Sequence, residues 1–145
     1  MGENFRLKEA QQNLLIHLLN GNDSLGVLPT NFGKSIIYQL APFVSRYLFK
    51  EKGHKQFSPH PVIIVISPIN ALIDDQINRC LEMNLRAVKL SAENISVFKT
   101  GEVDIIYTSP ECLLDDTFRG ILLSSLYQGR VIGIVVDEVH VVVKW

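Results

Sequence analysis

Three consecutive residues, Gly33, Lys34 and Ser35, have the types that end a phosphate-binding loop of the pattern GxxxxGK[ST]. In such a loop backbone N–H groups surround the phosphates, the lysine ammonium reaches the β and γ phosphates, and the serine hydroxyl is a ligand of Mg²⁺. The first glycine of the pattern is replaced by Leu28. A lone GKS more often marks a turn into a helix, so the nucleotide interpretation needs support from its surroundings.

Two adjacent carboxylates, Asp137 and Glu138, follow the apolar run 131–136. If that run is a strand of an open parallel sheet, both carboxylates lie at its carboxyl end, where such sheets bind ligands. One carboxylate can hold Mg²⁺ through water, and the other can polarise the attacking water. A solvated strand end is the alternative for this pair taken alone. Combined with the phosphate loop, the pair supplies the groups needed for nucleoside triphosphate hydrolysis.

The elements that must position these groups follow from hydrophobic periodicity. Apolar runs predict strands at 24–28, 62–66, 86–90, 104–107 and 131–136. Helical spacing predicts helices at 9–20, 34–49 and 71–83, and helical segments near 112–127. The run VIIVI at 62–66 has no polar residue, as expected of a strand buried on both faces. This alternation predicts an α/β fold, a parallel sheet with helices on both faces.

Length and composition narrow the class of protein. The 145 residues, 47% of them hydrophobic, are enough for one domain with a substantial core. A net charge of −1 excludes a nucleic-acid binder that relies on basic composition alone. Cys80 and Cys112 are too few for a disulfide framework or a four-cysteine zinc site. No apolar run approaches the ~20 residues of a membrane span, and we expect a nuclear or, as second choice, cytoplasmic protein.

The segment DEVH at 137–140 resembles the DEAH-type motif II of superfamily 2 helicases, and the surrounding motifs resemble those of RecQ-like DNA helicases. In family order the motifs are LKEAQ, LPTNFGKSIIYQLAP, SPINALIDDQ, YTSPECLL and DEVHVVVKW, and they cover almost the whole chain. The resemblance implies a RecA-like P-loop NTPase lobe that is truncated after motif II. Residues 1–145 would then be the N-terminal part of a helicase ATP-binding domain, as a single incomplete domain.

The resemblance further implies ATP and Mg²⁺ as cofactors. Lys34 and Glu138 are the implied catalytic residues, and Ser35 and Asp137 the implied metal ligands. Gln11 matches the glutamine that recognises adenine. Its amide can both donate and accept hydrogen bonds, as recognition of adenine requires. The alternative is an ordinary exposed helix residue, because a second glutamine, Gln12, is adjacent. The implied nucleotide-binding residues are Gln11, Thr30, Asn31, Phe32, Gly33, Lys34, Ser35 and His140, the last of which couples the nucleotide and nucleic-acid sites. The family usually has glycine where this chain has Asn31, the residue type that tolerates positive φ best after glycine.

Two of the motifs lie on the path of single-stranded DNA in the family. The nucleic-acid residues implied are Ser67, Pro68, Asn70, Thr108, Ser109 and Trp145. Hydroxyls and backbone amides at helix starts can bind phosphates without lysine or arginine, which suits a chain of nearly neutral charge. The alternative is that the Ser-Pro pairs only cap helices. The implied partners are single-stranded or forked DNA and the second RecA-like lobe of a longer chain.

We therefore predict part of an ATP-dependent DNA helicase, of the 3′-to-5′ type that the resemblance implies, with DNA repair and recombination as the implied processes. The strand that carries motif III and the second lobe are missing from the 145 residues, so the isolated chain is expected to be inactive. Two alternatives stay open. A non-catalytic nucleotide-binding remnant is favoured by Asn31. An RNA helicase of the same superfamily is the nearer alternative, disfavoured because DEVH and the VVVKW continuation look more RecQ-like than DEAD-box.

Overall fold

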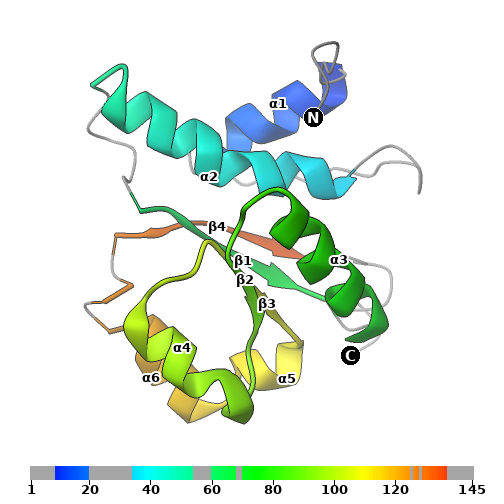
Figure 1. Cartoon of the computed structure of the whole chain (residues 1–145), viewed down its shortest axis with the longest axis vertical. Coiled ribbons are helices and arrows are strands. Elements are labelled where there is room, and N and C mark those ends of the chain that lie inside the picture. The colour runs from blue at the N-terminus through cyan, green and yellow to red at the C-terminus, as the bar shows by residue number, and fades with distance from the viewer. Residues whose placement is uncertain are drawn as a thin grey trace.

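The computed structural model describes residues 9–19, 34–53, 60–67, 70–124, 126–127 and 129–136. Helices and strands alternate along most of these residues, as Figure 1 shows. In chain order the elements are α1 (Glu9–Leu19), α2 (Lys34–Lys50), β1 (Val62–Ile66), α3 (Asn70–Glu82), β2 (Ala87–Lys89), the 3₁₀ turn η1 (Ala92–Asn94), α4 (Ile95–Thr100), β3 (Ile105–Thr108), α5 (Pro110–Leu113), α6 (Asp116–Leu122) and β4 (Val131–Val136).

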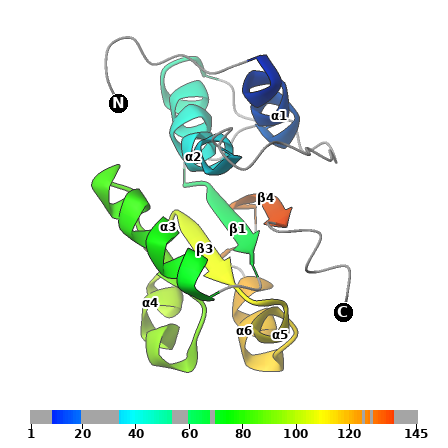
Figure 2. The ribbon, with the colours of Figure 1, turned by 90° about the vertical axis from the view of Figure 1, so that its right-hand side faces the viewer.

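The described strands form one sheet of order β2-β3-β1-β4, and every neighbouring pair is parallel. The interior strands β1 and β3 are buried along almost their whole length, as the run VIIVI of β1 predicted for that strand. Helices cover both faces of the sheet, with α1 and α2 on one side and α4, α5 and α6 on the other (Figure 2). The predicted α/β class, a parallel sheet between helices, is confirmed.

Each face of the sheet has its own hydrophobic core. On one face α1, α2 and α3 pack against side chains such as Ile63, Val65 and Ile105, all fully buried. On the other face Phe98 of α4 and Phe118 of α6 pack against the opposite side of β1 and β3. Because side chains of a strand alternate between the two faces, one apolar strand serves both cores.

Most predicted boundaries lie within a residue or two of the observed ones. The strands at 62–66 and 131–136 match, whereas those predicted at 86–90 and 104–107 are observed as Ala87–Lys89 and Ile105–Thr108. The predicted strand at 24–28 lies outside the described residues. Among the described residues no helix has both the length and the apolar character that crossing a bilayer requires.

A buried carboxylate, Asp104, joins the amino end of β3 to its surroundings. Its side chain is 5% exposed and accepts hydrogen bonds from Arg46 Nη2 at 2.9 Å and from the Arg86 backbone N at 2.8 Å. The Arg86 guanidinium adds bonds of 3.2 and 3.3 Å to the two carboxylate oxygens. The bond to Asp104 is the main reason why the pKa of Arg86 is raised above its usual value. The carboxylate thus ties α2 and the residue before β2 to the start of β3.

The helical segments η1 and α4, which lie between β2 and β3, were not predicted from the sequence. This segment is short and has the single fully buried anchor Phe98, so it lacks a sustained apolar period. Gly101 ends α4 in the left-handed conformation, with φ of 75°, and its N–H donates to Phe98 O at 3.2 Å. A Cβ at this position would lie 2.9 Å from Leu126 Cδ1.

Replacing Gly101 by alanine is therefore expected to lower the free energy of unfolding by about 1–2 kcal/mol, because a side chain is strained at positive φ and meets Leu126. Urea unfolding followed by circular dichroism measures the change. The matched control is Gly120→Ala, because a Cβ on this glycine of α6 would meet nothing within 4 Å and alanine favours a helix. A Gly101→Ala protein as stable as Gly120→Ala would contradict the role of the left-handed turn.

Candidate nucleotide and nucleic-acid site

Three neighbouring strands end together at the carboxyl edge of the sheet. Ile66, the last residue of β1, pairs with Thr108 of β3 and with Val136 of β4. Just beyond β1, the Ser67 backbone N donates to Thr108 O at 2.9 Å. Of the residues predicted to contact nucleic acid, Ser67, Thr108 and Ser109 are thus brought side by side from two separate motifs.

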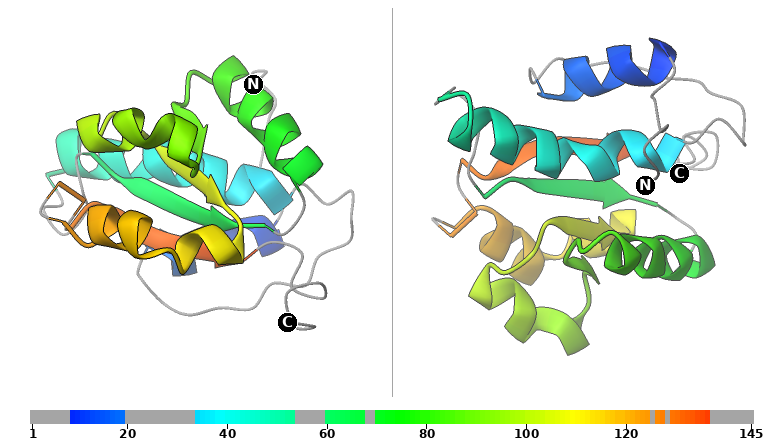
Figure 3. Two further views of the ribbon diagram at one scale, coloured as in Figure 1. Left: turned by 90° about the horizontal axis from the view of Figure 1, so that it is seen from below. Right: turned by 45° about the horizontal axis from the view of Figure 1, so that its top comes forward.

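Helix α2 begins at the same edge. Lys34 is its first residue, and Figures 1 and 3 show that this end of α2 lies on the side of the sheet where the arrowheads of β1 and β4 lie. Ser35 is half-buried in the first turn. The first N–H groups of a helix have no partner within the helix and carry a partial positive charge, so they attract anions such as phosphate. The start of α2 and the ends of the strands can therefore serve one polyanionic ligand.

Ser67 has an unusual environment for a hydroxyl group. The residue is 3% exposed, and its Oγ has no hydrogen-bond partner within the part of the chain that the structure describes. An unpaired buried hydroxyl costs free energy, so such groups in native proteins usually serve a ligand, a water molecule or a conformational change. This orphan hydroxyl lies at the edge where the sequence predicts contacts with nucleic acid.

Thr108 and Ser109 have different tasks in the structure. Thr108 is fully buried, and its Oγ1 donates to Ser109 O at 2.9 Å. Ser109 caps α5, because its Oγ accepts from the backbone N of Cys112 at 3.3 Å, with Pro110 as the first helical residue. Ser109 therefore caps a helix, and its contact with nucleic acid stays a prediction. The Ser109 hydroxyl proton is still available to donate, whereas Thr108 positions Ser109 from beneath.

Gln11 and Gln12 differ in burial. Gln11 is 5% exposed in α1, while Gln12 is exposed. The alternative that Gln11 is an ordinary exposed helix residue is therefore wrong. Gln11 lies one helical turn before the buried Leu15, on the face of α1 that packs towards the rest of the fold.

The other predicted site residues lie outside the described residues or at their edges. Those outside are Thr30, Asn31, Phe32, Gly33, Pro68, Asp137, Glu138, His140 and Trp145. Lys34 and Asn70 are the first residues of α2 and α3. Asp137 follows Val136 directly in the sequence, and Val136 pairs with the end of β1. Among the described residues no group of three or more histidine, cysteine, aspartate or glutamate side chains could hold a metal ion by itself.

A buried polar network that the sequence analysis did not predict crosses the core beneath α2. The hydroxyls of Tyr38 and Tyr107 lie 2.9 Å apart, and the Tyr107 hydroxyl lies 3.6 Å from Cys80 Sγ. The amide of Gln39 donates to Cys80 Sγ at 3.6 Å and to Gln76 Oε1 at 3.2 Å. We call these five residues the tyrosine network. It joins α2, α3 and β3.

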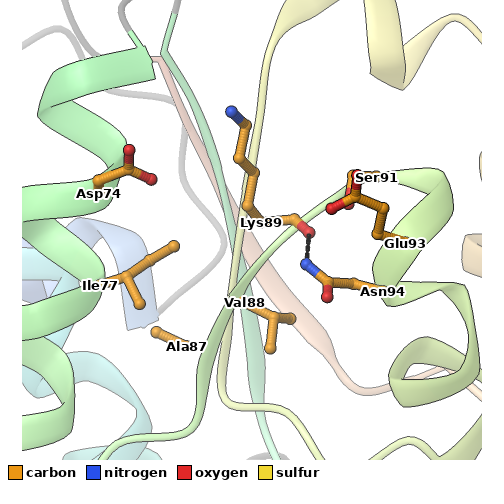
Figure 4. A pocket seen from close by; sticks show the side chains of 8 residues that line it. All are labelled: Asp74, Ile77, Ala87, Val88, Lys89, Ser91, Glu93 and Asn94. Carbon is orange, nitrogen blue, oxygen red and sulfur yellow. Dashed lines mark hydrogen bonds between the residues drawn. The ribbon is translucent and has the colours of Figure 1, made fainter.

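A pocket of about 540 Å³ lies elsewhere, against the edge strand β2 (Figure 4). It is lined by α3, β2 and the turn that follows, and contains none of the predicted site residues. At its rim the Asn94 side-chain amide donates to the backbone O of Lys89 at 3.0 Å. Lys89 belongs to the outer strand of the described sheet, and its carbonyl has no strand partner there. The Asn94 amide supplies the hydrogen bond instead.

Comparison with known proteins agrees with this geometry. The family model described as "DEAD/DEAH box helicase" matches residues 8–145. The chain is 33% identical to "ATP-dependent helicase SGS1" of Saccharomyces cerevisiae over 136 residues, which are 88% of this chain and 9% of that protein. It is 30% identical over 155 residues to "ATP-dependent DNA helicase hus2/rqh1" of Schizosaccharomyces pombe, covering 97% of this chain and 11% of the relative.

A bacterial relative is similar to the same degree. The chain is 31% identical to "ATP-dependent DNA helicase RecQ" of Synechocystis over 136 residues, which are 88% of this chain and 25% of that protein. The chain therefore spans a quarter or less of the length of these three relatives. The similarity to RecQ-type helicases that the motifs indicated is confirmed.

Proposed function

Because the chain belongs to the DEAD/DEAH box helicase family, we propose that it binds and hydrolyses ATP and uses the reaction to move along single-stranded DNA, as part of a RecQ-type helicase. The observation that carries this proposal is the common edge at which β1, β3 and β4 end and α2 begins. Its relatives are named ATP-dependent DNA helicases, which favours DNA over RNA.

In this proposal the nucleotide lies at the start of α2. The loop that precedes Lys34 and the first amides of the helix surround the phosphates, Lys34 neutralises the β and γ phosphates, and Gln11 reads the adenine. Ser35 and Asp137 would hold Mg²⁺, and their hydroxyl and carboxylate oxygens are the donors that this ion prefers. When bound, Mg²⁺ neutralises charge that develops on the phosphates.

Glu138 polarises the attacking water. As a carboxylate next to the metal-holding Asp137, it accepts the proton of the water that attacks the γ phosphate. His140, two residues further along, would transmit the state of the nucleotide site to the nucleic-acid site. A second lobe that closes over the nucleotide would convert hydrolysis into movement along the strand, in the 3′-to-5′ direction of the proposed type.

The nucleic acid would follow the same edge of the sheet. The Ser109 hydroxyl would donate to phosphate oxygens, together with the backbone amides at the start of α3 near Asn70. The buried Oγ of Ser67 would join them after a local change of conformation that exposes it. Thr108 supports Ser109, and Pro68 and Trp145 would complete the contact surface. These are phosphate contacts without sequence information, which suits an enzyme that must act on any sequence.

The test is the rate of ATP hydrolysis by the natural full-length protein without nucleic acid, with single-stranded DNA and with RNA of the same sequence. We expect DNA to raise the rate at least about 10-fold more than RNA does. Equal stimulation by RNA would favour the RNA helicase alternative. If the protein binds a fluorescent ATP analogue but hydrolyses no ATP under any of these conditions, it is a non-catalytic nucleotide-binding protein. Asn31, which replaces a glycine of the family, favours this alternative.

A further inference from the structure

The tyrosine network joins the three elements that carry the proposed site. Tyr38 and Gln39 belong to α2 and lie about one turn after Lys34, the residue of that helix at the proposed phosphate site. Tyr107 of β3 is followed by Thr108, the last residue of that strand, and then by Ser109, both at the proposed nucleic-acid site. Gln76 and Cys80 belong to α3, whose first residue is Asn70. One chain of hydrogen bonds inside the protein therefore reaches from the phosphate helix to the strand end that would touch DNA.

Four of the five residues of this network are deeply buried. Tyr38, Gln39, Cys80 and Tyr107 are 4%, 3%, 0% and 1% exposed, in the middle of an apolar core. Desolvation raises the pKa of Tyr107 far above its usual value and also raises that of Cys80. Both groups therefore stay protonated at physiological pH, and each can donate a hydrogen bond as well as accept one. A chain of neutral donors and acceptors of this kind has few alternative arrangements.

Packing alone does not require these hydroxyls. Phenylalanine would fill the same space at both tyrosines, because the rings already pack edge to face with centroids 6.1 Å apart and planes at 71°. The 2.9 Å contact between hydroxyls adds a constraint on distance and direction that rings alone do not give. A satisfied buried network fixes one arrangement of the elements it joins, since any shift of α2 against β3 breaks it.

We propose that Tyr107 is a positioning residue that couples the two sites: through Tyr38 and Cys80 it fixes the strand end at Thr108 and Ser109 relative to the start of α2 and to α3. DNA bound at Ser109 would then act on the phosphate helix through this contact. The inference rests on the proposed function and adds to it a route by which nucleic acid stimulates hydrolysis.

The test compares Tyr107→Phe with the unchanged natural full-length protein. The variant keeps the ring and loses only the hydroxyl, so it removes the contacts with Tyr38 and Cys80. The measured quantity is the ratio of DNA-stimulated to unstimulated ATP turnover. We expect this ratio to fall by about 3- to 30-fold, the range over which residues along a coupling route alter coupling, while the KM for ATP stays within about two-fold.

Tyr127→Phe is the matched control. Tyr127 is 1% exposed and donates a buried hydrogen bond to Phe98 O at 2.6 Å, but it lies in the core on the other face of the sheet. Its variant also loses one buried hydroxyl, so it reproduces the loss of stability without touching the network. We expect its stimulation ratio to match that of the unchanged protein.

A second variant tests the route itself. Tyr38→Phe removes the same contact between hydroxyls from the other side. The stimulation ratio of the double variant Tyr38→Phe/Tyr107→Phe should therefore be no lower than the lower of the two single-variant ratios. If the fold-losses of the two single variants multiply in the double variant, the two hydroxyls act independently, which would overturn the shared route. An equal ratio in Tyr107→Phe and Tyr127→Phe would overturn the inference alone. An unchanged protein that hydrolyses no ATP, with or without DNA, would overturn the proposed function and this inference together.

Discussion

Replacing Lys34 by alanine is expected to reduce DNA-stimulated ATP hydrolysis by the natural full-length protein at least about 100-fold, the effect of removing one preorganised charge-stabilising donor from an active site. Lys34 is the first residue of a 17-residue helix whose start lies at the carboxyl edge of the sheet. In the proposed mechanism the Lys34 ammonium would add to the positive charge at this end of the helix and neutralise phosphate charge. Steady-state turnover over a range of ATP concentrations measures the loss.

The companion variant Glu138→Gln should differ from Lys34→Ala in kind. Glutamine keeps the shape but cannot accept the proton of water, so we expect kcat to fall about 10²- to 10⁴-fold while nucleotide binding is kept. Lys34→Ala should weaken nucleotide binding as well. Lys50→Ala is the control, because it removes an exposed lysine from the last turn of the same helix. Turnover that survives in both Lys34→Ala and Glu138→Gln would contradict the proposed mechanism.

Replacing Asp104 by alanine is expected to lower the free energy of unfolding by about 2–4 kcal/mol. The buried carboxylate accepts bonds from both Arg46 and Arg86, and its loss leaves the Arg46 guanidinium, whose Nε is buried and unpaired among the described residues, without its charge partner. The larger share should come from Arg46 and from the backbone N of Arg86, because the Arg86 guanidinium is 52% exposed and solvent screens its charge.

Thermal and urea unfolding measure this change, as a fall in Tm of roughly 5–15 °C. Asp75→Ala is the control, since it removes an exposed aspartate from α3 and should alter stability by no more than about 0.5 kcal/mol. Asp104→Asn should give an intermediate loss, because an amide keeps the shape but accepts fewer hydrogen bonds. A stability loss in Asp104→Ala no larger than in Asp75→Ala would contradict the structural role of the buried carboxylate.

The sheet was predictable because two of its neighbouring strands, β1 and β4, are runs without a charged or polar side chain. The segments 62–66 and 131–136 are bounded by polar residues or proline, so composition alone marks their ends. Ser67 and Ser109 could be placed at one edge because residues that follow parallel strands share an edge. The burial of Gln11 was also readable in principle, because it lies four residues before Leu15 on the same helical face.

The rest depended on contacts between distant parts of the chain. Tyr38 and Tyr107 are 69 residues apart, and nothing in the spacing of either motif indicates that their hydroxyls meet. Asp104 similarly owes its role to Arg46, 58 residues earlier. The helix α4 was missed because Phe98 is its single fully buried anchor. Local periodicity predicts elements, whereas side-chain networks arise only when the elements are packed.

The Asn94 amide protects the outer edge of β2 from pairing with a strand of another chain. An outer strand with free backbone groups invites another chain to add a strand, the first step of edge-to-edge aggregation. Asn94 covers the carbonyl of Lys89, and the lysine charge and a strand of three residues make that edge a poor template. On β4, at the opposite side of the described sheet, Ile134 and Val136 are 59% and 41% exposed. Of the two outer strands among the described residues, β2 is therefore the one whose edge is protected by its own side chains, whereas β4 presents apolar side chains.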